Sequence, residues 1–171
     1  VGTAEKGRCE GLDDGWGLES AVEAEVGGRG EGAEHGGGVP IALSSLSDSS
    51  RQWFKAKVGL SGVAETTREI AFCSHAVLGA DLFEVPDARM DVRFHDNPLV
   101  TDQPGIRFYA GAPIVLSGGH RVGPLCVIDR EPRLLNDHHR PVLTQLSTVA
   151  GRALEGRLAL RMAGEAARRN A

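Results

Sequence analysis

IRFYAGAPIVLSGGHRVGPLCVIDR, residues 106–130, is the stretch that decides the fold of this chain. Its two halves alternate between apolar and other positions on either side of a Gly-rich break, Ser117–His120. Two runs with a period of two predict a β-hairpin, although Pro124 removes one ladder hydrogen bond and predicts a local distortion of the strand edge. The residues that we expect on a common face of each strand are Ile106, Phe108, Ala110, Ala112 and Ile114 in the first, and Val122, Cys126 and Ile128 in the second.

Shorter elements surround this hairpin. Apolar runs predict strands over 41–46, 51–58 and 82–85, and an apolar stripe predicts a helix from Thr66 or Thr67 to Leu78. A polar, turn-rich loop over 87–104 leads into the hairpin. A long helix capped by Asn136 or Asp137 is expected over 137–167. Strands, one middle helix, more strands and a terminal helix indicate an α+β fold with an antiparallel sheet.

The chain is predicted to contain one folded domain with two extensions. Residues 1–38 are expected to form a flexible Gly-rich N-terminal segment, with a short helix at Leu18, Val22 and Val26. The seven glycines of residues 27–38 leave too little apolar surface to offset the entropy of ordering. The folded domain covers 39–153, and 154–171 is expected to be an exposed extension of the last helix.

Composition excludes several classes of protein. A net charge of −4 argues against a nucleic-acid binder, which would carry a basic patch. No apolar run approaches the roughly 18 to 20 residues that span a bilayer, so no membrane partner is expected. Cys9, Cys73 and Cys126 are odd in number and lack CxxC spacing, which disfavours a disulfide framework or a structural zinc site. We expect a soluble domain in the reducing cytoplasm.

Short motifs follow one another in a fixed order between Val39 and Ala153: VPIAL (39–43), RQWFK (51–55), FCSH (72–75), VPD (85–87), DVRF (91–94), NPLV (97–100), FYAGAP (108–113) and LCVID (125–129). This order of motifs resembles the GAF domain family. The resemblance implies a central antiparallel sheet with helices on one face and a loop-roofed pocket on the other. It also implies a sensory or regulatory role, since the family occurs in histidine kinases, cyclic-dinucleotide enzymes and transcriptional activators.

The resemblance also selects candidate residues for binding a small molecule. Neighbours on a strand point to opposite faces, so one of Trp53 and Phe54 is expected in the core and the other in the pocket wall. Arg93 either reaches a polar ligand or forms a structural ion pair with Asp87 or Asp91. The complete set of ligand-binding candidates is Trp53, Phe54, His75, Asp87, Arg93, Phe94, Asn97 and Tyr109.

The cysteines leave an enzymatic alternative open. Cys73 continues the apolar stripe of Ile70 and Val77, which predicts a small core residue. A thiol-based reductase, similar to free methionine sulfoxide reductases, would need Cys73 within bridging distance of Cys126 or Cys9. A tetrapyrrole-binding photosensor is disfavoured, because residues 97–105 lack the cysteine that bilin-binding relatives use.

No metal and no cofactor are expected. The adjacent His138 and His139 lack the i, i+4 spacing of zinc sites, and the aspartates of loop 87–97 lack the EF-hand pattern. No nucleophile–base pair, P-loop or metal spacing is present. The sequence therefore predicts a non-catalytic sensory domain, which responds to an unidentified small molecule in two-component-type signalling.

The last helix suggests how this domain acts on its partners. We expect it to pass the signal to an effector, a kinase or cyclase, in the same gene. A homodimer could form through this helix, and a purely structural dimerisation module is the remaining alternative.

Overall fold

The computed structural model describes residues 41–47, 52–58 and 70–170, with side chains from residue 72 onward. Several sequence predictions lie outside the described residues. They are the N-terminal segment 1–38 with its short helix, the first turn of the helix at Thr66 or Thr67, and the side-chain directions of Trp53 and Phe54.

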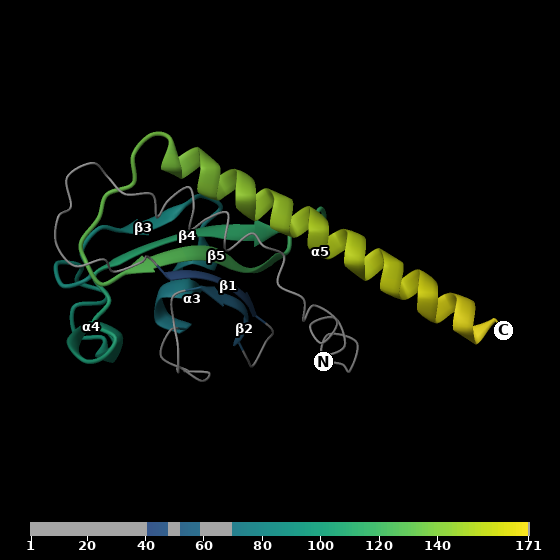
Figure 1. Cartoon of the computed structure of the whole chain (residues 1–171), viewed down its shortest axis with the longest axis horizontal. Coiled ribbons are helices and arrows are strands. Elements are labelled where there is room, and N and C mark those ends of the chain that lie inside the picture. Colours follow the sequence, from purple (N-terminus) through teal and green to yellow (C-terminus); the bar gives the residue numbers. More distant parts are fainter. Residues whose placement is uncertain (1–40, 48–51, 59–69, 171) are drawn as a thin grey trace.

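The core of the domain is a five-stranded sheet in the order β2-β1-β5-β4-β3. Its strands are β1 (Ile41–Ser47), β2 (Gln52–Val58), β3 (Phe83–Val85), β4 (Phe108–Val115) and β5 (Arg121–Asp129). All four neighbouring pairs are antiparallel, and each expected strand is present to within two residues. The antiparallel sheet of an α+β fold is confirmed (Figure 1).

The hairpin is confirmed, but the predicted faces need two corrections. Both faces of β4 and β5 are buried, so the alternating residues belong to two separate cores. Ile106 precedes β4 and packs in the core with Tyr109, not in the one with Phe108. Val122 packs with the opposite core from Cys126, because a register shift after Ile114 reverses the alternation.

Helices cover both faces of the sheet (Figure 1). The α3 helix (Ile70–Leu78) and the short α4 (Pro98–Thr101) lie with the loops on one side. Their apolar residues share a core with Tyr109, Cys126 and Ile128. The α5 helix (His139–Arg169) crosses the other face. Its Leu143 and Ala150 share a core with the remaining strand residues Phe108, Ala110, Ala112, Ile114, Leu125 and Val127.

The sheet contains Pro124 without losing its register on β4, where Pro124 lies opposite Pro113. Pairing of β5 with β1 ends at Leu125, and pairing of β4 with β3 ends at Gly111. Each proline therefore lies just beyond the stretch that pairs with its outer neighbour strand, where proline is tolerated. The hairpin ladder has its register shift between Ile114 and Val115, close to the prolines, and the β1–β2 pair has a separate one between Ser44 and Ser45.

The start of α5 is fastened to the sheet edge. The N-cap position of α5 is His138, and not Asn136 or Asp137 as predicted. Asn136 Oδ1 accepts hydrogen bonds from the amides of His138 (3.0 Å) and His139 (2.8 Å), so its side chain holds the turn that leads into the helix. Glu84 of β3 accepts two hydrogen bonds from Arg140, at 3.0 and 3.1 Å. The helix begins at His139, two residues later than predicted, so Pro141 falls in its first turn, where proline is tolerated.

Only the first half of α5 packs on the sheet. The helix has 31 residues, which corresponds to about 46 Å. Its last buried residue is Leu154, and the remainder extends beyond the sheet (Figure 1). Among the described residues, no helix is both long enough and apolar enough to cross a bilayer.

Candidate functional site

An aromatic cluster fills the space between the sheet and the α3 side of the domain. The Phe72 and Phe94 rings stack with centroids 4.1 Å apart, and Tyr109 lies 5.3 Å from Phe72. His75 stacks on Phe83 at 5.9 Å and meets the Phe94 ring edge-on at 5.2 Å. We call these five residues the aromatic cluster. It joins α3, β3, β4 and the loop 86–97 through favourable ring contacts.

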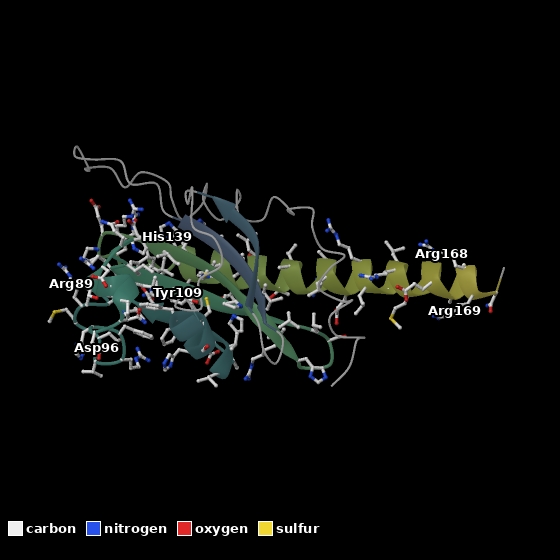
Figure 2. All side chains as sticks on the ribbon, turned by 90° about the horizontal axis from the view of Figure 1, so that it is seen from below. Arg89, Asp96, Tyr109, His139, Arg168 and Arg169 are labelled. Atoms are coloured by element: carbon white, nitrogen blue, oxygen red, sulfur yellow. The ribbon has the colours of Figure 1, made fainter. Side chains whose placement is uncertain are left out.

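Tyr109 forms the floor of this cluster and is fully buried (Figure 2). Its hydroxyl lies 3.6 Å from Cys73 Sγ and also interacts with Cys126. Burial, followed by the neighbouring thiols, raises the pKa of the phenol well above its usual range, so it stays protonated. Gly111 makes room for the ring, since a Cβ there would lie 2.6 Å from the Tyr109 hydroxyl.

Arg93 covers the cluster from the solvent side. Its guanidinium carbon lies 4.9 Å from the Phe83 centroid and 5.3 Å from the Phe94 centroid, in cation–π geometry. The same guanidinium pairs with Asp91 at 2.6 Å, which confirms the predicted structural ion pair. This hydrogen bond lowers the pKa of Asp91.

Asp87 pairs with Arg89 and not with Arg93. Arg89 Nη2 lies 2.7 Å from Asp87 Oδ2, and its Nε and backbone N–H both reach Oδ1. The side-chain hydrogen bonds of Arg89 lower the pKa of Asp87. Asp91 and Arg93 repeat the same arrangement four residues later. The two clamps fix the backbone of the loop on either side of Met90.

Asn97 stabilises the start of a short helix. Its side chain accepts a hydrogen bond from the Leu99 amide (2.9 Å) and caps α4, and Pro98 follows at the first position. Sequence reasoning missed this short helix, although Asn followed by Pro is a known signature of a helix start. Arg107 holds the end of the same turn by donating to the Val100 carbonyl at 2.7 Å.

The structure thus brings four of the predicted site residues into one cluster: His75, Arg93, Phe94 and Tyr109. Asp87 and Asn97 lie in the adjoining loop. Trp53 and Phe54 lie on β2, opposite Leu46 and Ser45 of β1, at the far edge of the sheet from β3. Phe72 and Phe83 were missed as site residues, because spacing within a helix or a three-residue strand does not reveal which rings meet.

Exposure divides the cluster into a floor and a rim. Phe72, Phe94 and Tyr109 are buried, whereas His75 and Phe83 are half-buried and Arg93 is exposed. An aromatic surface with an imidazole and a guanidinium at its rim suits a flat ligand that carries a polar or anionic group. Within the described part of the chain, no group of three His, Cys, Asp or Glu side chains is arranged to hold a metal ion.

Comparisons with known proteins agree with this fold. The family model of the GAF domain matches residues 13–154. The cyclic di-GMP phosphodiesterase PA2567 of Pseudomonas aeruginosa is 55% identical over 95 residues, which are 56% of this chain and 16% of that protein. The chain therefore matches only a small part of that relative's length.

Solved structures share the fold at low sequence identity. The cyanobacteriochrome receptor PixJ has a TM-score of 0.57 at 13% identity, covering 90% of this chain and 98% of that one. A GAF domain region from Geobacter sulfurreducens PCA has a TM-score of 0.55 at 21% identity, covering 92% and 99%. The type II free methionine-R-sulfoxide reductase of Thermoplasma acidophilum has a TM-score of 0.54 at 12% identity, covering 81% and 96%.

Proposed function

Because this chain belongs to the GAF domain family, we propose that it is the sensory domain of a signalling protein whose effector hydrolyses cyclic di-GMP. The observation that carries the proposal is the 55% identity over 95 residues to a cyclic di-GMP phosphodiesterase. That relative favours a phosphodiesterase as the effector, in place of the kinase or cyclase expected from the sequence. In this proposal the domain itself is cytoplasmic and non-catalytic, and it controls the effector through α5.

The proposed ligand site is the rim of the aromatic cluster. His75 and Arg93 supply polar contacts over an aromatic floor that includes Phe94 and Tyr109. Asp87 and Asn97 contribute by fixing the loop that carries Arg93. Trp53 and Phe54 stay in the proposal as residues of a wall on β2. The ligand class that fits best is a planar small molecule with an anionic or strongly polar group.

The output of the proposed domain is α5. Its second half lies beyond the sheet, with Leu160 and Met162 exposed, which favours contact with a second copy or with the effector. Figure 2 shows Arg168 and Arg169 at the far end of this helix, well away from the sheet. We propose a homodimer through this segment, and light scattering that gives a monomeric mass would contradict it.

Two experiments test the sensory proposal. The coding sequence that flanks this chain should encode a cyclic di-GMP phosphodiesterase domain, and a different effector would refute that half. A thermal-denaturation screen with nucleotides, cyclic nucleotides, tetrapyrroles and aromatic metabolites should find a compound that raises Tm. The shift should shrink in Arg93→Gln and persist in the matched variant Arg89→Gln. A screen in which no compound raises Tm would refute the ligand half.

One observation favours a second candidate function, a thiol-based reductase. The Tyr109 hydroxyl interacts with both Cys73 and Cys126, so two thiols meet at one buried point. Both thiols are buried, which keeps a substrate from reaching them in this conformation. Reduction of free methionine sulfoxide by the intact chain, and its loss in Cys73→Ser, would support this function. Turnover that Cys73→Ser leaves unchanged would remove it.

A further inference from the structure

The tip of the β4–β5 hairpin, residues 116–122, contacts helices on both faces of the sheet. On one side, Arg121 Nη1 donates hydrogen bonds to the carbonyls of Val77 (3.4 Å) and Leu78 (3.1 Å), the last two residues of α3. On the other side, the Ser117 amide donates to Glu155 Oε1 of α5 at 2.6 Å. One turn therefore holds the end of α3 and the middle of α5.

The contact with α3 is electrostatically well matched. The last carbonyls of a helix lack intrahelical partners and carry partial negative charge, which a guanidinium satisfies. The same short helix supplies Phe72 and His75 to the aromatic cluster. A shift of these rings would therefore move the carbonyls that Arg121 holds.

The contact with α5 lies where that helix leaves the sheet. Leu154 is the last buried residue of α5, and it packs against Leu116 and Val122 of the tip. Gly151 lets the helix approach closely, since a Cβ there would lie 2.7 Å from the Val115 carbonyl oxygen. The hydrogen bonds from Ser117 also lower the pKa of Glu155, so the acceptor stays ionised at neutral pH.

The tip itself is closed by its own hydrogen bonds. The Leu116 amide donates to the His120 carbonyl (2.9 Å), and the Gly119 amide donates to the Leu116 carbonyl (2.8 Å). Gly119 has a φ of +81°, a conformation that favours glycine. A turn braced in this way moves as a unit.

We propose that the hairpin tip is a coupling element, which transmits a displacement of α3 on one face of the sheet to the exit point of α5 on the other. The use of this coupling in signalling rests on the proposed sensory function. The coupling itself is a property of the fold and is testable without a ligand. It requires that the tip shift between two arrangements whose balance both helices influence, through the hydrogen bonds of Arg121 to α3 and of Ser117 to Glu155.

Hydrogen exchange of the intact chain tests the proposal. In Arg121→Gln, amides at the end of α3 should exchange faster by about threefold to tenfold, as loss of a charge-assisted hydrogen bond allows. The coupling predicts a parallel increase over residues 152–158 of α5, although the hydrogen bonds of Arg121 go to α3. Glu155→Ala should give the reciprocal result, with faster exchange at the end of α3.

Arg140→Gln is the matched control. It breaks the link from Glu84 to the start of α5, so it should speed exchange near residue 140 and leave the end of α3 unchanged. Effects of Arg121→Gln confined to α3, together with effects of Glu155→Ala confined to α5, would overturn the proposal. The two proposals can fail separately. A ligand-induced Tm shift that persists in Arg121→Gln supports the sensory function even if the coupling fails. Coupled changes in hydrogen exchange without any ligand support the coupling even if the sensory function fails.

Discussion

On the α5 face of the sheet the clustered apolar side chains are aliphatic apart from Phe108, whereas the α3 face buries Phe72, Phe94 and Tyr109 together with two thiols. The α5 face achieves close packing with small residues, and Gly151 brings helix and strand backbones together. The α3 face holds a hydroxyl against a thiol, and an imidazole and a guanidinium against aromatic rings. One face is therefore packed almost entirely with aliphatic groups, while the other carries the polar and aromatic groups of the proposed ligand site.

The largest effect is expected from opening the α3 face. Phe94→Ala should lower the free energy of unfolding by about 3–5 kcal/mol, because it removes a buried ring that contacts Phe72 and His75. Urea denaturation measures this loss. Leu143→Ala on the α5 face is the control, and indole should raise the Tm of the Phe94 variant only. If indole raised the Tm of both variants, the proposed difference between the α3 and α5 faces would be contradicted.

The close approach of α5 to β4 is tested by substituting two glycines of α5, Gly151 and Gly156. Gly151→Ala should destabilise the domain by about 1–3 kcal/mol, since its Cβ would meet the Val115 carbonyl oxygen at 2.7 Å. At Gly156 a Cβ meets nothing within 4 Å, so Gly156→Ala should stabilise by up to about 1 kcal/mol through helix propensity. Thermal unfolding compares the two, and effects of the same sign would contradict the packing.

The contribution of the rim of the α3 face is tested by comparing its two Asp–Arg pairs, Asp87–Arg89 and Asp91–Arg93. Arg93→Gln and Arg89→Gln each remove an ion pair to the aspartate two residues before. Only Arg93 also lies over two rings, so its loss should cost about 0.5–1 kcal/mol more through the cation–π contacts. Chemical denaturation of both variants gives the difference, and equal losses would show that the ring contacts contribute nothing to stability.

The smallest effect on stability is expected from lowering the pH. Asp87, Asp91 and Glu155 all have pKa values below their ordinary values of 3.8, 3.8 and 4.5, because each accepts hydrogen bonds from a neighbouring residue. Depressed carboxyl pKa values give stability that is fully present above the unfolded values and is lost as pH falls through the folded ones. Tm should therefore fall below about pH 4.5, and less steeply in Asp91→Asn. An unchanged slope in that variant would exclude the Asp91 clamp as a contributor.

The hairpin was predictable because its period of two extends over both strands. Which residues lie on which face of the two strands was harder to predict, because a strand that is buried on both sides has no polar face to mark its register. Ile106 lies before the strand, and the bulge after Ile114 shifts Val122. The core position of Cys73 was predictable, because its neighbours on the helix repeat at helical spacing.

The candidate site was predictable only in part. The sequence indicates Arg93, Phe94 and Tyr109 through motif resemblance, and the Arg93–Asp91 pair through proximity. It could not show that Arg93 covers Phe83, because that contact joins a loop to a short edge strand. The sequence also could not show that Asp87 pairs with Arg89, because Arg89 and Arg93 both lie close to Asp87 and Asp91 along the chain.

The facing prolines have a consequence for the behaviour of the chain among other copies of itself. An unpaired strand edge attracts further strands, and proline blunts such an edge because it offers no donor. Pro113 and Pro124 lie in the segments of β4 and β5 that, within the described residues, are no longer paired with β3 and β1. A proline in each of these segments therefore disfavours pairing of this end of the sheet with a strand of another copy.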